Sequence, residues 1–246
     1  MHYSTPYLLI ILSGMLFYAT GLAAADTDFK TGLNDGYALL QLGGPVVMVL
    51  IGMSIVGLAI LLYKLLQFRR FSNTVFSKLD RVLSDWLEGD CSTTDEQIKT
   101  IDSPVAAVLE TGMILLDQVD FDEERIREEL TRQAQWVALQ VYSLLRFMEQ
   151  IAYLAPLLGL LGTVLGIIDV FQGLADRGVD ADPGILAGGI WEALLTTAVG
   201  LTVAIPFALL HAVLESRANT IRMKMEDLLT RLFTLKRVRR SVGGAE

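Results

Sequence analysis

The chain has 246 residues, of which 52% are apolar and 20% charged, and its mean hydropathy is +0.48. Soluble domains carry nearer a quarter charged residues, so the composition argues against an ordinary soluble domain and a disordered chain. The net charge of -8 provides no broad basic surface for nucleic acid. The single cysteine, Cys91, allows neither an internal disulfide nor a cysteine-based zinc site. The composition therefore predicts an integral membrane protein.

Four long stretches carry at most one charge, and a bilayer-spanning helix needs about 20 mostly apolar residues. They are residues 3–25, 36–63, 150–168 and 183–214. The first stretch ends in AAA before Asp26, which is typical of a cleaved secretory signal, although no Lys or Arg precedes it. We predict a signal peptide over residues 1–25. The alternative is an additional, uncleaved span.

Lys and Arg are concentrated after the second and the fourth stretch. The segment before the second stretch (26–38) holds only Lys30, and the segment between the third and the fourth stretch (169–183) holds only Arg177. The positive-inside rule therefore places the basic segments in the cytoplasm and the mature N-terminus in the periplasm. The predicted fold is all-α, with three transmembrane helices extending into a helical cytoplasmic domain. Its segments are a signal peptide (1–25), a periplasmic segment (26–38), transmembrane helix 1 (39–63), a cytoplasmic helical domain (64–149), transmembrane helix 2 (150–172), a periplasmic loop (173–184), transmembrane helix 3 (185–211), and a cytoplasmic C-terminal helix with a basic tail (212–246).

The predicted cytoplasmic domain contains recognisable helix starts. Ser103-Pro104 combines a capping residue with proline at the first helical position. Asp120, with Glu123 three residues later, predicts a second start. No Gly or Pro follows before the third apolar stretch, so we expect one continuous helix into the bilayer. Residues 85–100, with Gly and many Ser and Thr, are expected to form a loop.

Glu192 is the residue that points most clearly to chemistry. An ionisable side chain within a span costs roughly 2.5–3.5 kcal/mol on insertion scales and therefore indicates function. Glu192 is expected about 10 Å inside the outer end of its span, from a rise of about 1.5 Å per residue. Low dielectric disfavours its charged form, which suits a proton-exchanging group. The alternative is a neutral, structural glutamate that bonds a neighbouring helix or reaches outward.

Threonines and small residues accompany Glu192. Helical spacing groups Thr196 with Glu192 and places Thr197 on another face, at a depth similar to Thr163 in the preceding span. Their hydroxyls can bond water or a carboxylate, and the alternative is a bond to a carbonyl of the same helix. Small residues permit close helix packing and prolines permit hinges. These packing and hinge candidates are Pro156, Gly159, Gly162, Gly166 and Pro206.

Asp169 and His211 receive no role, and Asp169 is expected to reach outward from the end of its span. Sequence motifs of soluble enzymes are absent, so we expect no enzymatic activity, cofactor or metal. One membrane carboxylate per chain does not form a route across about 30 Å of hydrocarbon. A proton pathway therefore requires further copies or a partner with another titratable group.

Two segments, LAPLLGLLGTVLGIIDVF (154–171) and GGIWEALLTTAVGLTVAIPFALL (188–210), strongly resemble the ExbB/TolQ/MotA proton-channel family. Residues 43–46 and SPVAAVLETG (103–112) are also similar, so the resemblance runs from about Tyr37 to Phe233. It implies a pentamer of long helices around a pore. It also implies a single-span partner of the ExbD or TolR type that carries an aspartate into the pore. Inward proton flow would then drive a periplasmic protein of the TonB or TolA type.

Position by position, Thr163 and Thr197 match the pore threonines of this family and Glu192 matches its membrane glutamate. Three spans disfavour a flagellar stator subunit, which has four. The amino-acid sequence around Glu192 resembles ExbB more than TolQ. We therefore expect an ExbB-like inner-membrane proton-channel subunit that energises outer-membrane import of nutrients such as iron chelates. The alternatives are a TolQ-like subunit for envelope integrity and a passive membrane scaffold.

Overall fold

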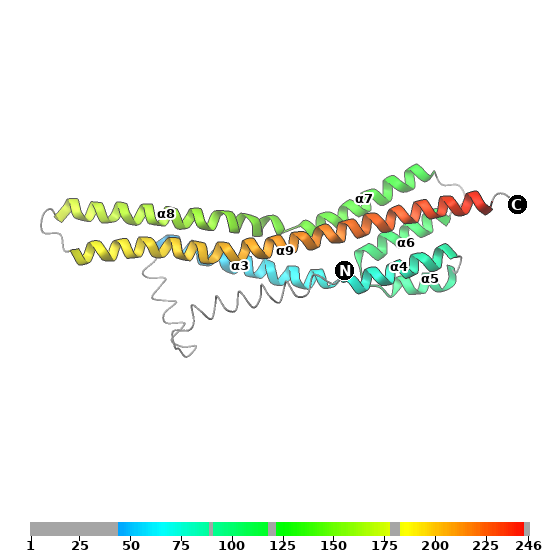
Figure 1. The fold of residues 1–246 in the computed structure, drawn as a ribbon, viewed down its shortest axis with the longest axis horizontal. Helices are drawn as coiled ribbons and strands as arrows, with labels where there is room; N and C mark the ends of the chain where they lie inside the picture. The colour runs from blue at the N-terminus through cyan, green and yellow to red at the C-terminus, as the bar shows by residue number, and fades with distance from the viewer. Residues whose placement is uncertain (1–43, 89–90, 118–121, 178–182, 244–246) are drawn as a thin grey trace, which may run out of the picture. The chain divides into compact units, whose positions relative to one another are not determined.

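The computed structural model describes residues 44–88, 91–117, 122–177 and 183–243 (Figure 1). Its helices are α3 (Gly44–Arg69), α4 (Asn73–Glu88), α5 (Cys91–Lys99), α6 (Pro104–Asp117), α7 (Glu123–Tyr142), α8 (Leu145–Arg177) and α9 (Pro183–Gly243). No strand occurs among these residues, which confirms the all-α expectation. The described chain divides into two compact units, one of residues 44–60 and 144–213 and one of residues 61–143 and 214–243.

Three helices are long and apolar enough to cross a membrane, as expected, and they include α3, α8 and α9. The predicted signal peptide (1–25) and periplasmic segment (26–38) lie outside the described residues. Helix α8 continues to Arg177, inside the range 173–184 for which the sequence predicts a periplasmic loop. An apolar run shows only which part of a helix can lie in the hydrocarbon core of the bilayer. Backbone hydrogen bonds can continue the helix beyond that part.

The unit of residues 44–60 and 144–213 packs α3 against the pair α8 and α9, which run antiparallel side by side (Figure 1). Leu50 of α3, Ala155 of α8 and Ala204 of α9 form its buried centre. A methyl group added at Gly57 of α3 would lie 2.5 Å from the ring of Phe207. Small side chains thus let large ones from a neighbouring helix approach the backbone closely, and this packing positions the site described below.

The other unit contains α4 to α7 with residues 61–69 of α3 and 214–243 of α9. Its core is an apolar stripe on each amphipathic helix, spaced at three and four residues. On α4 the buried residues are Phe76, Leu79, Val82, Leu83 and Trp86. Polar bonds join α9 to its neighbours at the rim: Lys224 Nζ donates to Asn73 Oδ1 at 2.7 Å, and Arg231 pairs with Asp80.

The loop expected over 85–100 is wrong, because α4 continues to Glu88 and α5 covers Cys91–Lys99. Ser- and Thr-rich segments favour loops in isolation because their side chains compete for backbone hydrogen bonds. Here Thr94 and Ile98 are buried. A helix this short is marginal alone, so we attribute it to its packing against α4 and α6.

The predicted start at Ser103-Pro104 is confirmed, because α6 begins at Pro104 and Ser103 Oγ accepts a hydrogen bond from Val105 N. The second start lies elsewhere than predicted. Helix α7 is capped by Asp122, whose carboxylate accepts from Glu124 N at 3.2 Å. Asp120 itself lies outside the described residues. An acidic run offers several possible caps, and spacing alone does not choose among them.

The expected continuous helix from the cytoplasm into the membrane is also wrong. Helix α7 ends at Tyr142 and α8 begins at Leu145. Between them Leu144 has φ of 63°, the only positive φ at a non-glycine residue in the described chain. That conformation costs an L-residue roughly 1–2 kcal/mol, so other contacts must stabilise the break.

Lys64 supplies those contacts from 76 and more residues away in the sequence. Its side chain is fully buried, and Nζ donates to Val141 O at 2.9 Å and to Gln140 O at 3.2 Å. Nζ also donates to Gln67 Oε1 at 2.6 Å. A cation at a helix C-terminus satisfies carbonyls that have no partner within the helix and interacts favourably with the helix dipole. Lys64 therefore caps α7 and stabilises the break.

Replacing Lys64 with Met should destabilise the protein. The substitution leaves Val141 O buried without this donor, at a cost of roughly 1–3 kcal/mol, whereas Gln140 O keeps Gln67 Nε2 and Ser143 Oγ as donors. The thermal unfolding midpoint of the detergent-purified protein should fall by several degrees, while Lys78→Met, at an exposed position of α4, should leave it unchanged. An unchanged midpoint for Lys64→Met would mean that other contacts hold the break.

Candidate functional site

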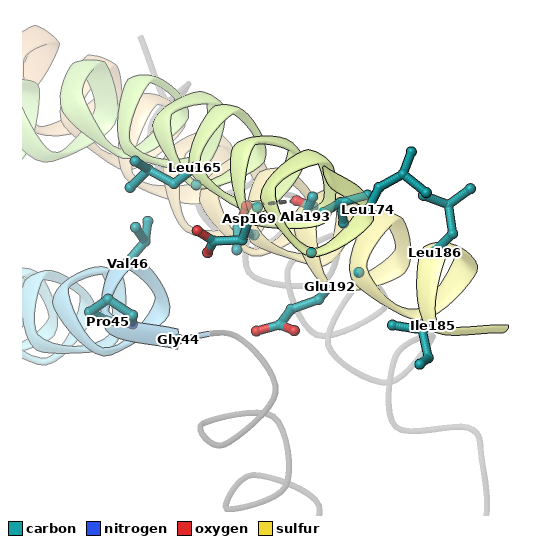
Figure 2. Close-up of a pocket in the computed structure, with 16 residues that line it drawn as sticks. Gly44, Pro45, Val46, Leu165, Asp169, Leu174, Ile185, Leu186, Glu192 and Ala193 are labelled. Carbon is teal, nitrogen blue, oxygen red and sulfur yellow. Dashed lines mark hydrogen bonds between the residues drawn. The ribbon is translucent and has the colours of Figure 1, made fainter. Parts of the chain in front are cut away.

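A cavity of about 580 Å³ lies between the start of α3, the last turns of α8 and the first turns of α9 (Figure 2). Most of its lining consists of glycines and aliphatic side chains. Two residues that line it are titratable, Asp169 of α8 and Glu192 of α9. Figure 2 shows both carboxylates pointing from α8 and α9 toward the start of α3 at Gly44 and Pro45. The cavity therefore brings two acidic groups from two helices next to one apolar-walled space.

Glu192 lies nine residues after the start of α9 and is exposed within the single chain. Among the described residues, its carboxylate makes no hydrogen bond and no salt bridge. A carboxylate left in that state inside lipid is costly. It therefore requires water, another copy of the chain or a partner, and the adjoining cavity offers it space.

The hydroxyls of Thr196 and Thr197 bond the same carbonyl of α8. Each Oγ1 lies 3.1 Å from Gly159 O. Thr196 is buried, and its Oγ1 also lies 2.7 Å from Ala193 O. Of the two threonines, Thr196 lines the cavity with Glu192. The two threonines thus bond α9 to α8 about one helical turn after Glu192.

Thr163 lies on α8, and its hydroxyl donates to Leu160 O of the same helix at 2.7 Å. Neither Thr163 nor Thr197 is among the residues that line the cavity. The structure of one chain therefore groups Glu192 with Thr196, and leaves Thr163 outside this group. A shared pore lined by Thr163, Thr197 and Glu192 stays a proposal.

The small residues predicted for packing lie where α8 and α9 approach most closely. A methyl group added at Gly162 would lie 2.5 Å from Thr196 Oγ1, and one at Gly166 would lie 2.8 Å from Ala193 Cβ. At Gly159 it would lie 3.0 Å from Thr196 O. Gly200 of α9, which sequence reasoning did not single out, faces Gly159 across the contact. A methyl group there would lie 2.7 Å from Ala155 O.

Both proline candidates lie inside unbroken helices, Pro156 in α8 and Pro206 in α9. Each lacks a backbone N–H, so the helix loses one hydrogen bond at that point. Continuity of the helix in one structure does not test a hinge, which stays a prediction. His211, also on α9, is partly buried.

Asp169 is the residue of this site to which sequence reasoning gave no role. It lies eight residues before the end of α8, and Glu192 lies nine residues after the start of α9. In an antiparallel pair, residues equally far from the connection lie at equal depth. Counting residues backwards along α8 and forwards along α9 from the segment that joins them places Asp169 and Glu192 at the same depth. The spacing of residues on one face of one helix does not show this.

Residues 100–227, just over half of the chain, match the family described as the MotA/TolQ/ExbB proton channel family. This chain belongs to that family. Because the family is one of channels, the expectation that the protein is not an enzyme is confirmed. The matched region includes α8, Glu192 and both threonines of the α8–α9 contact.

Curated relatives agree with this assignment. The biopolymer transport protein exbB1 of Vibrio cholerae is 41% identical over 90 residues, which are 37% of this chain and 40% of the relative. The Tol-Pal system protein TolQ of Haemophilus influenzae is 35% identical over 89 residues, 36% of this chain and 39% of the relative. The putative biopolymer transport protein ExbB-like 3 of Synechocystis sp. is 29% identical over 179 residues, 71% of this chain and 82% of the relative. The chain thus spans about two fifths of the length of the Vibrio and Haemophilus proteins.

Replacing Gly200 with Ala should loosen the contact between α8 and α9. The added methyl group meets backbone atoms of Ala155 and Gly159, which cannot move without the helix, and overpacking of this kind costs about 1–3 kcal/mol. The unfolding midpoint in detergent should therefore fall. Gly188→Ala on the same helix is the matched control, because a methyl group there meets nothing within 4 Å. Equal losses in the two variants would contradict the steric explanation.

Proposed function

We propose that this chain is the proton-conducting subunit of an ExbB-like complex in the bacterial inner membrane. The observation that carries the proposal is the unpartnered carboxylate of Glu192, on a membrane-length helix, beside a cavity between three such helices. An ionisable group on a membrane-length helix that has no structural partner is a candidate for binding and releasing protons. Membership of a proton-channel family supports the same conclusion.

Additional titratable groups must complete the route, because one carboxylate does not bridge about 30 Å of hydrocarbon. We propose that copies of this chain, five by the family resemblance, surround a pore. A single-span partner of the ExbD or TolR type brings an aspartate to the depth of Glu192. Protons then pass between the two carboxyl groups. Thr197 donates its proton to Gly159 O, which leaves its oxygen free to accept from water or from a protonated carboxyl.

The proposed topology has the mature N-terminus in the periplasm and the C-terminus in the cytoplasm. Proton flow would drive a periplasmic transducer of the TonB or TolA type and so energise import across the outer membrane, for example of iron chelates. The relatives named exbB1 and ExbB-like 3 favour this output. The match to a TolQ of similar identity keeps a TolQ-like role in envelope integrity as the second candidate.

The test replaces Glu192 with Gln, which keeps the shape of the side chain and removes its titration. In a strain lacking this protein, the wild type should restore uptake of a labelled ferric chelate, and Glu192→Gln at matched membrane level should restore almost none. Asp176→Asn is the control, because Asp176 is an exposed carboxylate of α8 that does not line the cavity. It should restore uptake fully.

Other outcomes select the other candidates. Full uptake with Glu192→Gln would make Glu192 structural and favour a passive scaffold. If uptake never depends on this protein, but the wild type restores detergent resistance to a strain lacking its TolQ-like subunit, the TolQ-like role is the correct one.

A further inference from the structure

We infer that Asp169 is a second proton-exchanging residue, which relays protons between external water and Glu192 through the open cavity between α3, α8 and α9 of a single chain. This inference rests on the proposed function and adds a residue to it. In the relay, a proton from external water binds the Asp169 carboxylate. The protonated Asp169 then gives a proton to an intervening water, and that water gives a proton to the Glu192 carboxylate. Asp169 is thereby a carboxylate again. One proton enters and one moves on, and no other reactant is needed.

The first argument is position. Asp169 and Glu192 lie eight and nine residues from the ends of α8 and α9 that are joined to each other. A rise of about 1.5 Å per residue puts both about 12–14 Å along their helices from that connection. Both side chains line the same cavity, and Figure 2 shows both carboxylates pointing toward the start of α3. The two groups are therefore neighbours in depth and share one space.

The second argument is the cavity itself. Its volume of about 580 Å³ accommodates several waters, each of which occupies about 30 Å³ in the liquid. The part of α3 that lines it, Gly44 to Val46, is uncharged. On α8 and α9 its other lining residues are glycines, aliphatic side chains and Thr196. Any water in this space that meets a titratable group of the described chain thus meets Asp169 or Glu192.

The third argument is that Asp169 has no structural task in the described chain. Its carboxylate forms no salt bridge and accepts no hydrogen bond among the described residues. The contact between α8 and α9 is made by small residues and by Thr196 and Thr197. A carboxylate within a span is costly to insert. Asp169 does not offset that cost by packing, whereas exchange of protons with water in the cavity would explain its presence.

The test measures proton flux into proteoliposomes that contain the complex purified through a tag on this chain. Asp169→Asn should reduce flux by about a hundredfold, the lower end for loss of a proton-transfer group. Asp169→Glu should retain flux within about twofold, and Asp176→Asn should match the wild type. Glu192→Gln gives the background leak. Formate, a small acid that fits the cavity, should restore much of the lost flux to Asp169→Asn after subtraction of that leak.

Each result decides the inference. Wild-type flux in Asp169→Asn, with Glu192→Gln at background, overturns the role of Asp169 and leaves the proposed function intact. Flux in Glu192→Gln equal to the wild type overturns the proposed function itself. Low flux in Asp169→Asn that formate does not restore, with equally low flux in Asp169→Glu, means a structural role and overturns the relay. If Asp169→Asn does not assemble, the comparison of Asp169→Glu with wild type decides, and a loss greater than about twofold overturns the relay.

Discussion

The close approach of α8 and α9 is the constraint on which the rest of the site depends. Glycines and alanines remove the side chains that would separate the helices, and Gly159 and Gly200 face each other across the contact. At this distance two threonine hydroxyls of α9 reach one carbonyl of α8. In lipid, where apolar burial gives little preference for helix pairing, such packing and hydrogen bonding are what hold helices together. They also determine where the carboxylates of the two helices lie.

This contact lies between two sets of polar groups. Thr196 and Thr197 are bound to the neighbouring helix, so within one chain they stabilise the pair. Asp169 and Glu192 are acidic groups at the cavity beyond that contact. Close packing of the two helices presents both carboxylates to one cavity at similar depth, which suits the proposed exchange of protons between them.

Lys64 performs a different task in the other unit. A buried ammonium that bonds the last carbonyls of α7 replaces the hydrogen bonds that a continuous helix would have made. Lys64 follows directly after an apolar stretch, where a lysine is expected to mark the cytoplasmic end of a span. The same residue therefore carries a charge of the kind that the positive-inside rule expects at the cytoplasmic end of a span, and makes the hydrogen bonds that end a helix.

The sequence by itself determined the class of protein, the three membrane-length helices and the start of α6, because long apolar runs and capping residues act locally. It also singled out Glu192, because a charge in such a run is conspicuous. Tertiary structure alone decided the break at Leu144, the helix α5 and the role of Gly200. These depend on Lys64, on buried Thr94 and Ile98, and on the backbone of α8, which are contacts between segments far apart in the chain. Tertiary structure also decided that Asp169 and Glu192 line one cavity, because the residue spacing along one helix does not show which residues of a second helix lie beside it.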